Sequence, residues 1–546
     1  MKIQPLYRSF YFLCSLIICC FITACSQNET SNKSVFYYNE VGSLTSLDPA
    51  FARNFENIWA VNQLYDALLE FDSSLALKPC LADSFAVSDA GKTYTFYIKA
   101  GVYFHSNAEG EKLPLEAEDV AYSLQRLIHS DLASPGRWVM NDVAQVGDTL
   151  DVVYHNTKRT VQIRLQKANA SFLYKLAMPY AKIISKQAYL NNSTEFYTHP
   201  IGSGPFQFFV WENRVNLVMH KNEHYHQKDN SGQQLPYLDA VSVSFLKDPN
   251  AVFLSALNGQ FHLVSGLTGE FRDELLNRKG SLKDQYKNKF VLRKVPYLYT
   301  EYLGFYLDSN LVNNPFLKHN QVRQALSMAI DRNKLISQLR GNIGVADVNG
   351  VVPNVLLPTR GKHPAYTYNV NEAKRMLLET IGEGPYGEIE LFAASAQSDL
   401  CEFVQNAWSD LGFNVKVNIQ PTSALGNNIA TGKASVFRKS WIADYPDAEN
   451  FLSLFYAPNF SPNGPNYTHF GNAEIDSLYV QLCETIGFED RQKLSMDIDS
   501  IATNNMPLIP LYYGEVTHLL KSEVLNFNSD AMNVLNLKQV KLKQQN

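Results

Sequence analysis

The pattern with the most specific chemistry in the sequence is His220-Lys221-Asn222-Glu223-His224. It matches the HxxEH arrangement in which inverted zincins bind zinc through two histidines and use the glutamate as a general base. That chemistry needs both histidines on one helical face, whereas the preceding residues alternate as in a strand. An extended chain would hold His220 and His224 about 13 Å apart, too far for one zinc ion. A zinc metallopeptidase using His220, Glu223 and His224 is therefore a remote alternative, and we expect no metal site.

Other patterns that would point to catalysis are weak or missing from the sequence. Gly202-Ser203-Gly204 lacks the spacing of the GxSxG nucleophile elbow and suits a turn instead. The sequence contains no P-loop and no GxGxxG phosphate cradle, so we do not expect the chain itself to hydrolyse ATP. We expect a protein that is not an enzyme and that uses no cofactor.

The N-terminal residues have the features of an export signal. Lys2 and Arg8 precede an apolar run over 10–21, which is shorter than the roughly 20 residues that a membrane-spanning helix needs. Ile22-Thr23-Ala24-Cys25 then resembles a bacterial lipobox, in which the cysteine thiol accepts a diacylglycerol group. We therefore expect a signal peptide over 1–24.

Cys25 would then be the lipidated first residue of the mature protein, at the start of a polar tether over 25–34. The alternative is that Cys25 merely ends a cysteine-rich signal segment. Removal of 1–24 leaves 46 basic and 53 acidic residues, a net charge of −7 that disfavours nucleic-acid binding. The remaining cysteines are an odd set without CxxC spacing and predict neither a disulfide framework nor a zinc–cysteine site. They are Cys80, Cys401 and Cys483.

The rest of the chain alternates between segments of strand and helix periodicity. The predicted strands cover 34–38, 93–98, 216–219, 240–245 and 413–419. The predicted helices cover 58–69, a segment after Pro114, 249–259, 322–339, 373–378 and 403–411. Because strands and helices alternate, the sequence predicts the α/β class.

Several of these segments, in this order, resemble one family. The most specific are Ser88 to Phe96, Gly101 to His105 and Ala117 to Leu124. Further matches lie at 202–206, 236–239, 301–305, 322–332 and 441–447. Together they resemble the bacterial extracellular solute-binding proteins of peptide and nickel ABC transporters (family 5), of the oligopeptide- and dipeptide-binding type. The resemblance covers nearly the whole chain from about residue 34.

The resemblance implies a two-lobe periplasmic-binding-protein fold, type II-like, with an extra inserted domain and a two-segment hinge. One lobe would be discontinuous, the insertion would belong to that lobe, and the hinge would lie near Glu301-Tyr302 and Met506-Pro507. The implied boundaries are 35–72, 200–296 and 505–546 for lobe 1, 73–199 for the inserted domain and 297–504 for lobe 2.

The resemblance also implies a function. With the lipid predicted on Cys25, the protein would be a monomer anchored in the cell envelope on the periplasmic or extracellular side of a membrane. It would capture short peptides between the lobes by hinge closure and deliver them to the permease subunits of an ABC importer. A binder of the same fold for another solute, such as a nickel chelate, a haem or an oligosaccharide, is the alternative.

A binder of varied peptides must hold their constant groups, which are the ammonium, the carboxylate and the backbone. An ammonium is best held by a carboxylate, and a carboxylate by arginine. By resemblance, Asp444 takes the position that receives the peptide ammonium, although it could instead cap a turn before Pro446. Arg438 takes the position that reaches a peptide carboxylate, with the adjacent Lys439 as the alternative if the register is shifted.

Four more residues complete the predicted ligand-binding site. Trp441 and Tyr445 would offer aromatic walls to the ligand, although a tryptophan in this setting is as often part of a core. Glu40 and Val41, beside the first strand, would add a contact and backbone pairing with an extended peptide.

Overall fold

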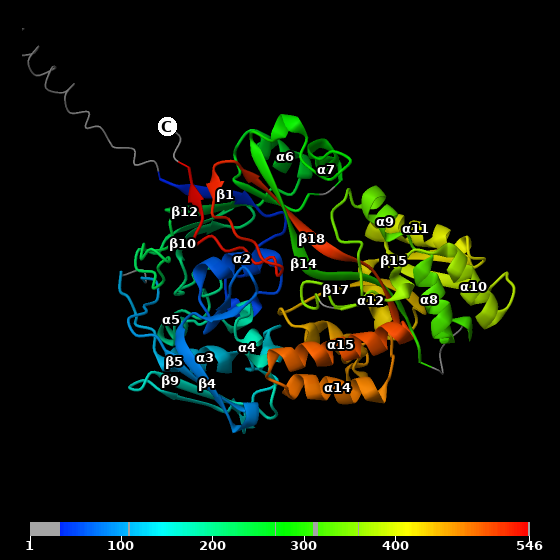
Figure 1. Ribbon diagram of the computed structural model, residues 1–546. Coiled ribbons are helices and arrows are strands. Elements are labelled where there is room, and N and C mark those ends of the chain that lie inside the picture. The colour runs from blue at the N-terminus through cyan, green and yellow to red at the C-terminus, as the bar shows by residue number, and fades with distance from the viewer. Residues whose placement is uncertain (1–32, 107–109, 268, 309–314, 359, 544–546) are drawn as a thin grey trace, which may run out of the picture.

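A mixed β-sheet runs through both halves of the protein in the computed structural model, with helices packed around it (Figure 1). The structure describes residues 33–543 except 107–109, 268, 309–314 and 359. In spatial order the strands of this sheet are β10 (Phe206–Glu212), β11 (Asn216–Lys221), β12 (Ala240–Ser244), β1 (Val35–Asn39), β13 (Leu263–Ser265), β18 (Leu508–Lys521), β14 (Phe290–Phe305), β17 (Val436–Ile442), β15 (Glu388–Ala394) and β16 (Asn414–Gln420).

The two long strands β14 and β18 join the two halves of the sheet. They pair antiparallel from Phe290 opposite Lys521 to Gly304 opposite Leu508. At one end β18 pairs with β13, and at the other end β14 pairs with β17. The pairing of β14 with β18 is irregular between Pro296 and Thr300 and again beside Glu301. These two strands are the two connections between the lobes, and a local break in the ladder is where such a pair can bend.

A separate four-stranded sheet builds the region between β3 and β10. Its spatial order is β4 (Ala82–Ser88), β5 (Thr93–Ile98), β9 (Thr160–Arg164) and β8 (Val152–His155). The predicted strand over 93–98 is confirmed as β5, whose alternate side chains Tyr94, Phe96 and Ile98 are buried. Short strands complete the β-structure: β2 (Leu69–Phe71), β3 (Leu77–Pro79), β6 (Gln145–Val146), β7 (Thr149–Leu150), β19 (Val524–Leu525) and β20 (Lys541–Leu542).

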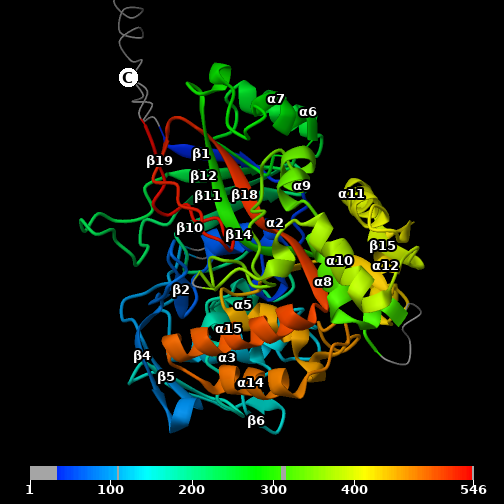
Figure 2. The same cartoon turned by 45° about the vertical axis from the view of Figure 1, so that its right-hand side comes forward.

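The helices divide between the same parts of the molecule (Figures 1 and 2). In the first half they are α2 (Phe55–Leu64), α3 (Ala117–Arg126), α4 (Phe172–Lys175), α5 (Lys186–Asn191), α6 (Pro249–Leu257) and α7 (Gly269–Leu275). In the second half they are α8 (Asn320–Met328), α9 (Arg332–Leu339), α10 (Val370–Ile381), α11 (Ser398–Ser409), α12 (Thr422–Ala430), α13 (Ala448–Leu452), α14 (Ala473–Glu484) and α15 (Phe488–Asn505).

The buried apolar residues form separate clusters, as expected for a chain of several folding units. One cluster fills the inserted region, another lies under β1 and its neighbours, and two more lie around β14 to β17. The units meet where α4 approaches α14 and α13. There the Ala170 amide donates to the Cys483 carbonyl (2.9 Å), and the Ser171 hydroxyl donates to Glu449 (3.2 Å).

Two helix predictions were wrong. The helix predicted over 322–339 is two helices, α8 and α9, because Asp331 leaves the helical conformation and its side chain caps α9 by accepting from the Lys334 amide (3.0 Å). The helix predicted over 58–69 is α2, which begins at Phe55 and ends at Leu64. Leu69 already belongs to strand β2, so its apolar spacing reflects burial rather than helix.

The predicted signal peptide and Cys25 lie outside the described residues. Among the residues that are described, no helix is long and apolar enough to cross a membrane. Cys80, Cys401 and Cys483 are free thiols, and the first two are buried.

Candidate ligand-binding site

Strand β17 and the loop after it carry the predicted ligand-binding residues of the second lobe. In the antiparallel pairing with β14, Ser440 lies opposite Glu301 and Trp441 lies opposite Thr300. Since side chains alternate along a strand, Arg438 shares a face of the sheet with Glu301. Trp441 lies on the other face, so the two side chains would reach a ligand from different sides of β17.

Arg438 is already paired inside the protein. Its Nη2 atom lies 2.5 Å from Glu301 Oε2, and the two side chains are only 15% and 1% exposed. Tyr512 donates to the same carboxylate oxygen (3.3 Å), and Tyr299 also hydrogen bonds to Glu301. Burial disfavours a charged guanidinium, but the charge of Glu301 outweighs it and holds the pKa of Arg438 above its ordinary value. A ligand carboxylate could therefore bind Arg438, as predicted, only in competition with Glu301.

Asp444 lies in the loop between β17 and α13. The Asn450 side-chain oxygen accepts from both Trp441 Nε1 (3.0 Å) and the Asp444 amide (3.3 Å), and so fixes the loop. The helix cap is Asp447, which accepts from the Glu449 amide (2.8 Å), so Asp444 does not start α13. Asp444 is exposed at the surface of the pocket, but protein surrounds its carboxylate on several sides. This partial loss of hydration raises the pKa of Asp444, while the hydrogen bond from Asn450 and the charge of Lys175 act to lower it.

The other predicted residues lie around this loop or farther away. Tyr445 is buried with the core of the inserted region, and its hydroxyl donates to Glu449 (2.6 Å). Glu40 follows β1, where its amide already donates to the Ser244 carbonyl (2.9 Å). Burial and the charge of Glu56 raise the pKa of Glu40 to about 8. Val41 is 54% exposed. The structure thus leaves ligand contacts of Tyr445, Glu40 and Val41 as predictions.

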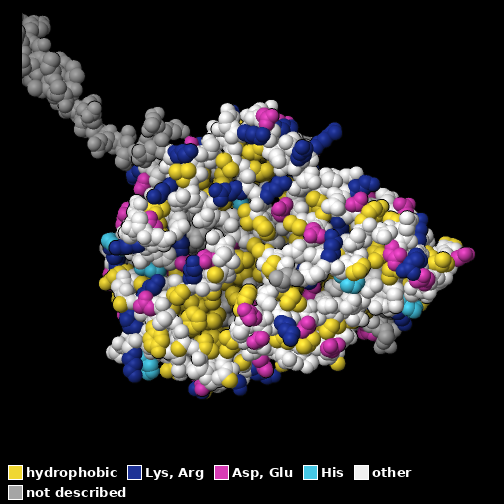
Figure 3. Space-filling model, viewed as in Figure 1, with side chains coloured by type: hydrophobic (Ala, Val, Ile, Leu, Met, Phe, Trp, Pro, Cys, Tyr) yellow, Lys and Arg dark blue, Asp and Glu magenta, His cyan; other side chains and the backbone are white. Residues whose placement is uncertain are grey.

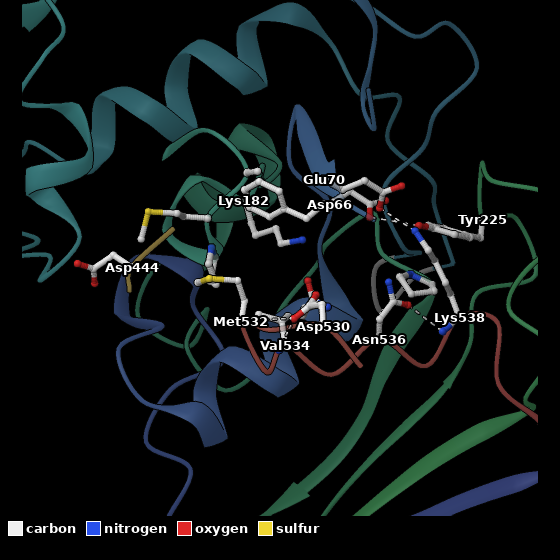
Figure 4. Close-up of a pocket in the computed structure, with 16 residues that line it drawn as sticks. Asp66, Glu70, Lys182, Tyr225, Asp444, Asp530, Met532, Val534, Asn536 and Lys538 are labelled. Atoms are coloured by element: carbon white, nitrogen blue, oxygen red, sulfur yellow. Dashed lines mark hydrogen bonds and ion pairs between the residues drawn. The ribbon is translucent and has the colours of Figure 1, made fainter. Parts of the chain in front are cut away.

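A pocket of about 730 Å³, counting the solvent at its mouth, lies between the lobes beside Asp444 (Figure 4). It is lined by Asn62, Asp66, Glu70, Phe71, Ala177, Met178, Pro179, Lys182, Pro205, Tyr225, Asp444, Asp530, Met532, Val534, Asn536 and Lys538. Asp444 is the one lining residue that comes from the region predicted as lobe 2. Of the six predicted ligand-binding residues, it alone lines this pocket.

Some charges of this pocket are satisfied within the protein. Asp66 Oδ2 lies 2.8 Å from His226 Nε2, and Lys538 donates to Glu70 (2.7 Å). Burial alone would raise the pKa of Asp66. The hydrogen bond from His226 and the nearby positive charges, including that of Lys182, hold it below its ordinary value.

Three further charged groups of the pocket have no ion-pair partner among the described residues: Lys182, Asp444 and Asp530. Lys182 follows the 3₁₀ turn Pro179–Ala181, and its residue is only 8% exposed. Asp530 accepts from the amides of Met532 (2.9 Å) and Val534 (3.4 Å), while burial raises its pKa to about 6. Sequence reasoning missed Lys182 and Asp530, which belong to no motif.

The HxxEH pattern does not form a metal centre. His220 is part of β11, as the alternation predicted, and its ring stacks on Phe209. Among the described residues, one group of three has ligand atoms within 4.8 Å of one another: Asp66, Cys80 and His226. Asp66 and His226 are already bonded to each other, and the charges of Lys182 and Lys538 act on the same group. These bonds and positive charges disfavour the binding of a metal cation by Asp66, Cys80 and His226.

A second hollow lies between the inserted region and α15 and has a different character. Its lining is mainly apolar and includes Leu75, Leu173, Val355, Ile486 and Phe488. Figure 3 shows apolar side chains gathered over this part of the face. The charged residues Arg491 and Asp447 at its rim are paired with each other at 2.5 Å. Among the described residues that line the hollow, the one other charged side chain is that of Glu489.

The fold defines a class: a two-lobe protein whose lobes are joined by two strands and enclose a pocket lined by charged residues. Residues 76–463 match the family model described as "Bacterial extracellular solute-binding proteins, family 5 Middle". The chain belongs to this family, whose members bind solutes for transport and are not enzymes. The resemblance noted in the sequence is confirmed, as is the α/β two-lobe fold class.

Similar proteins cover nearly the whole chain. The chain is 24% identical to di/tripeptide-binding protein 1 of Pseudomonas aeruginosa, covering 94% of each chain. It is 24% identical to heme-binding protein A of Haemophilus influenzae, covering 90% of this chain and 92% of that one. Among solved structures, HbpA2 from Haemophilus parasuis superposes with a TM-score of 0.82 at 22% identity, covering 93% of this chain and all of that one.

Proposed function

We propose that this protein captures short peptides in the interlobe pocket and that Asp444 receives their N-terminal ammonium group. The observation that supports this most directly is the Asp444 carboxylate, which lines the pocket without an ion-pair partner among the described residues. A carboxylate surrounded by protein is costly to keep charged, and a ligand ammonium would offset that cost with a charge-assisted hydrogen bond. The names of several relatives, including di/tripeptide-binding protein 1, are consistent with this ligand class.

Capture would proceed by closure of lobe 2 (297–504) onto lobe 1 and its inserted domain (73–199). Asp444 is the residue of lobe 2 that lines the pocket, and the other lining residues belong to lobe 1 and its inserted domain. Rotation of lobe 2 about β14 and β18 would therefore move Asp444 toward a ligand held by lobe 1. Arg438 remains a predicted carboxylate contact. It can play that role only if the ligand competes with Glu301 for the guanidinium.

We further propose that the protein is anchored by a lipid on Cys25 and hands its ligand to the permease of an ABC importer. The lipobox-like residues before Cys25 support the anchor. The intact mass of the protein extracted from membranes tests it, because lipidation adds acyl chains to a chain that begins at Cys25. A protein released into the aqueous fraction with an unmodified Cys25 would contradict the anchor.

Replacement of the proposed ammonium receptor tests the peptide site. Asp444→Asn should weaken binding of dipeptides and tripeptides by roughly 30-fold or more, because the peptide ammonium would lose its counter-charge in a desolvated site. N-acetylated peptides should bind wild type and variant equally weakly. The measurement is isothermal titration calorimetry on protein that has been unfolded and refolded to remove ligand acquired in the cell.

Asp497→Asn is the matched control, since Asp497 is exposed on α15 and does not line the pocket. It should bind peptides as the wild type does. Peptide binding that is unchanged in Asp444→Asn would refute the proposed site.

Haem is the alternative ligand, since heme-binding protein A is among the similar proteins. Haem binding would appear as a Soret absorption change on titration, without any response to peptides. That result would replace the peptide proposal.

A further inference from the structure

Among the described residues, the cation of the interlobe pocket that has no counter-ion is Lys182. Lys182 has no hydrogen-bond or ion-pair partner for its ammonium group among the described residues, although the residue is 8% exposed. Its aliphatic stem comes from the turn at 179–181, and its nitrogen points into the pocket (Figure 4). Buried ammonium groups without partners are rare because burial removes their hydration.

The neighbouring charges do not neutralise Lys182. Asp66 feels its charge but is bonded to His226 at 2.8 Å and to the Tyr225 hydroxyl at 3.2 Å. Glu70 is bonded to Lys538 at 2.7 Å. Asp66 and Glu70 are therefore committed to other donors, whereas the Lys182 ammonium has no hydrogen-bond partner among the described residues and can donate to a ligand.

We propose that Lys182 is a specificity-determining residue that receives a carboxylate group of the ligand. The pocket would then recognise a ligand with separated opposite charges, its ammonium at Asp444 and its carboxylate at Lys182. This inference rests on the proposed peptide function and deepens it by naming an acidic group as a required part of the ligand. The carboxylate is either the C-terminus of a short peptide or an acidic side chain.

The role differs from the one predicted for Arg438. Arg438 is held by Glu301 on β14 and does not line the pocket. Lys182 lines the pocket from the inserted region and has no such internal partner. A lysine ammonium is a compact charge on a flexible stem, so it can adapt to carboxylates at slightly different positions.

Matched ligand pairs test the proposal in wild type and in Lys182→Met. The pair Ala-Ala and Ala-Ala-amide reports on the C-terminal carboxylate. The pairs Ala-Glu-amide with Ala-Gln-amide and Glu-Ala-amide with Gln-Ala-amide report on an acidic side chain. In wild type, the charged member of at least one pair should bind roughly 10- to 100-fold more tightly, as expected for a charge-assisted hydrogen bond. In Lys182→Met the same preference should fall to less than about threefold.

Lys186→Met is the control, because Lys186 is close in sequence but forms a partly exposed pair with Glu118 (2.5 Å) away from the pocket. It should retain the full preference of the wild type. Ligand-free Lys182→Met should remain folded, although the buried Asp66 carboxylate loses one of the positive charges that favour its ionised form.

Two results would overturn the role of Lys182 and leave the peptide function intact. The first is a carboxylate preference that persists in Lys182→Met. The second is the absence of that preference from wild type that still binds peptides through Asp444. If wild type binds no peptide at all, the peptide function fails and this inference fails with it.

Discussion

Arg438 and Asp444 lie six residues apart on β17 and the loop after it, yet the structure treats their charges in opposite ways. Arg438 is half of a buried ion pair with Glu301, which two tyrosine hydroxyls complete. Asp444 faces the interlobe pocket without an ion-pair partner among the described residues. The first arrangement is complete without a ligand, and the second is not.

The difference separates two reasons for which a charged residue is retained in a protein interior. A buried charge is needed for folding when its removal would leave its partner buried without a counter-charge. An unpaired charge in a pocket reduces stability and is retained where it serves binding. By this criterion we predict that the pair of Glu301 with Arg438 stabilises the sheet and that Asp444, Lys182 and Asp530 contact the ligand.

The largest expected effect comes from breaking the complete pair. Glu301→Gln should lower the free energy of unfolding by about 3–5 kcal/mol, because the buried Arg438 guanidinium would keep its charge without a counter-charge. Asp444→Asn, by contrast, should change the free energy of unfolding by less than about 1 kcal/mol. Urea unfolding of the two ligand-free variants, followed by circular dichroism, measures both values.

A small effect of Glu301→Gln would reverse the comparison. It would mean that Arg438 does not depend on Glu301 and is available for the ligand carboxylate, as the sequence predicts.

A smaller effect is expected at Asp530, where the cost of an unpaired carboxylate depends on pH. The native protein holds the Asp530 proton up to a pKa of about 6, whereas the unfolded chain releases it near 3.8. Between these values the native state binds more protons, so rising pH lowers the stability of the wild type. Asp530→Asn should therefore gain stability relative to the wild type from about pH 4 to pH 6, by at most about 2 kcal/mol.

Between pH 6 and pH 7 the stability difference between Asp530→Asn and wild type should change by less than about 0.5 kcal/mol, and above about pH 7 it should stay constant. Urea unfolding at pH 4, 5, 6 and 7 measures this difference, with Asp497→Asn as a control that should show no such trend. A difference that does not change with pH would mean that Asp530 is not held protonated in the native state.

Local patterns predicted much of the fold. The alternation over 93–98 predicted β5, and the alternation before His220 predicted β11 and thereby excluded the zincin geometry. The helix predicted over 249–259 is α6, whose start Asp248 caps by accepting from the Asn250 amide. The break between α8 and α9 was missed because apolar spacing continues across it. Only the cap at Asp331 marks the end of one helix and the start of the next.

The sequence by itself determined the family and the α/β class, and it predicted Asp444 as a ligand-binding residue, because these rest on motifs within short stretches of chain. Tertiary structure decided which charges remain free. Arg438 is neutralised by Glu301, which is 137 positions away, and the pocket brings Lys182 together with Asp444 and Asp530 from distant parts of the chain. Whether a charge is paired depends on which groups folding places within a few ångströms and how much water it removes, and neither is encoded in local spacing.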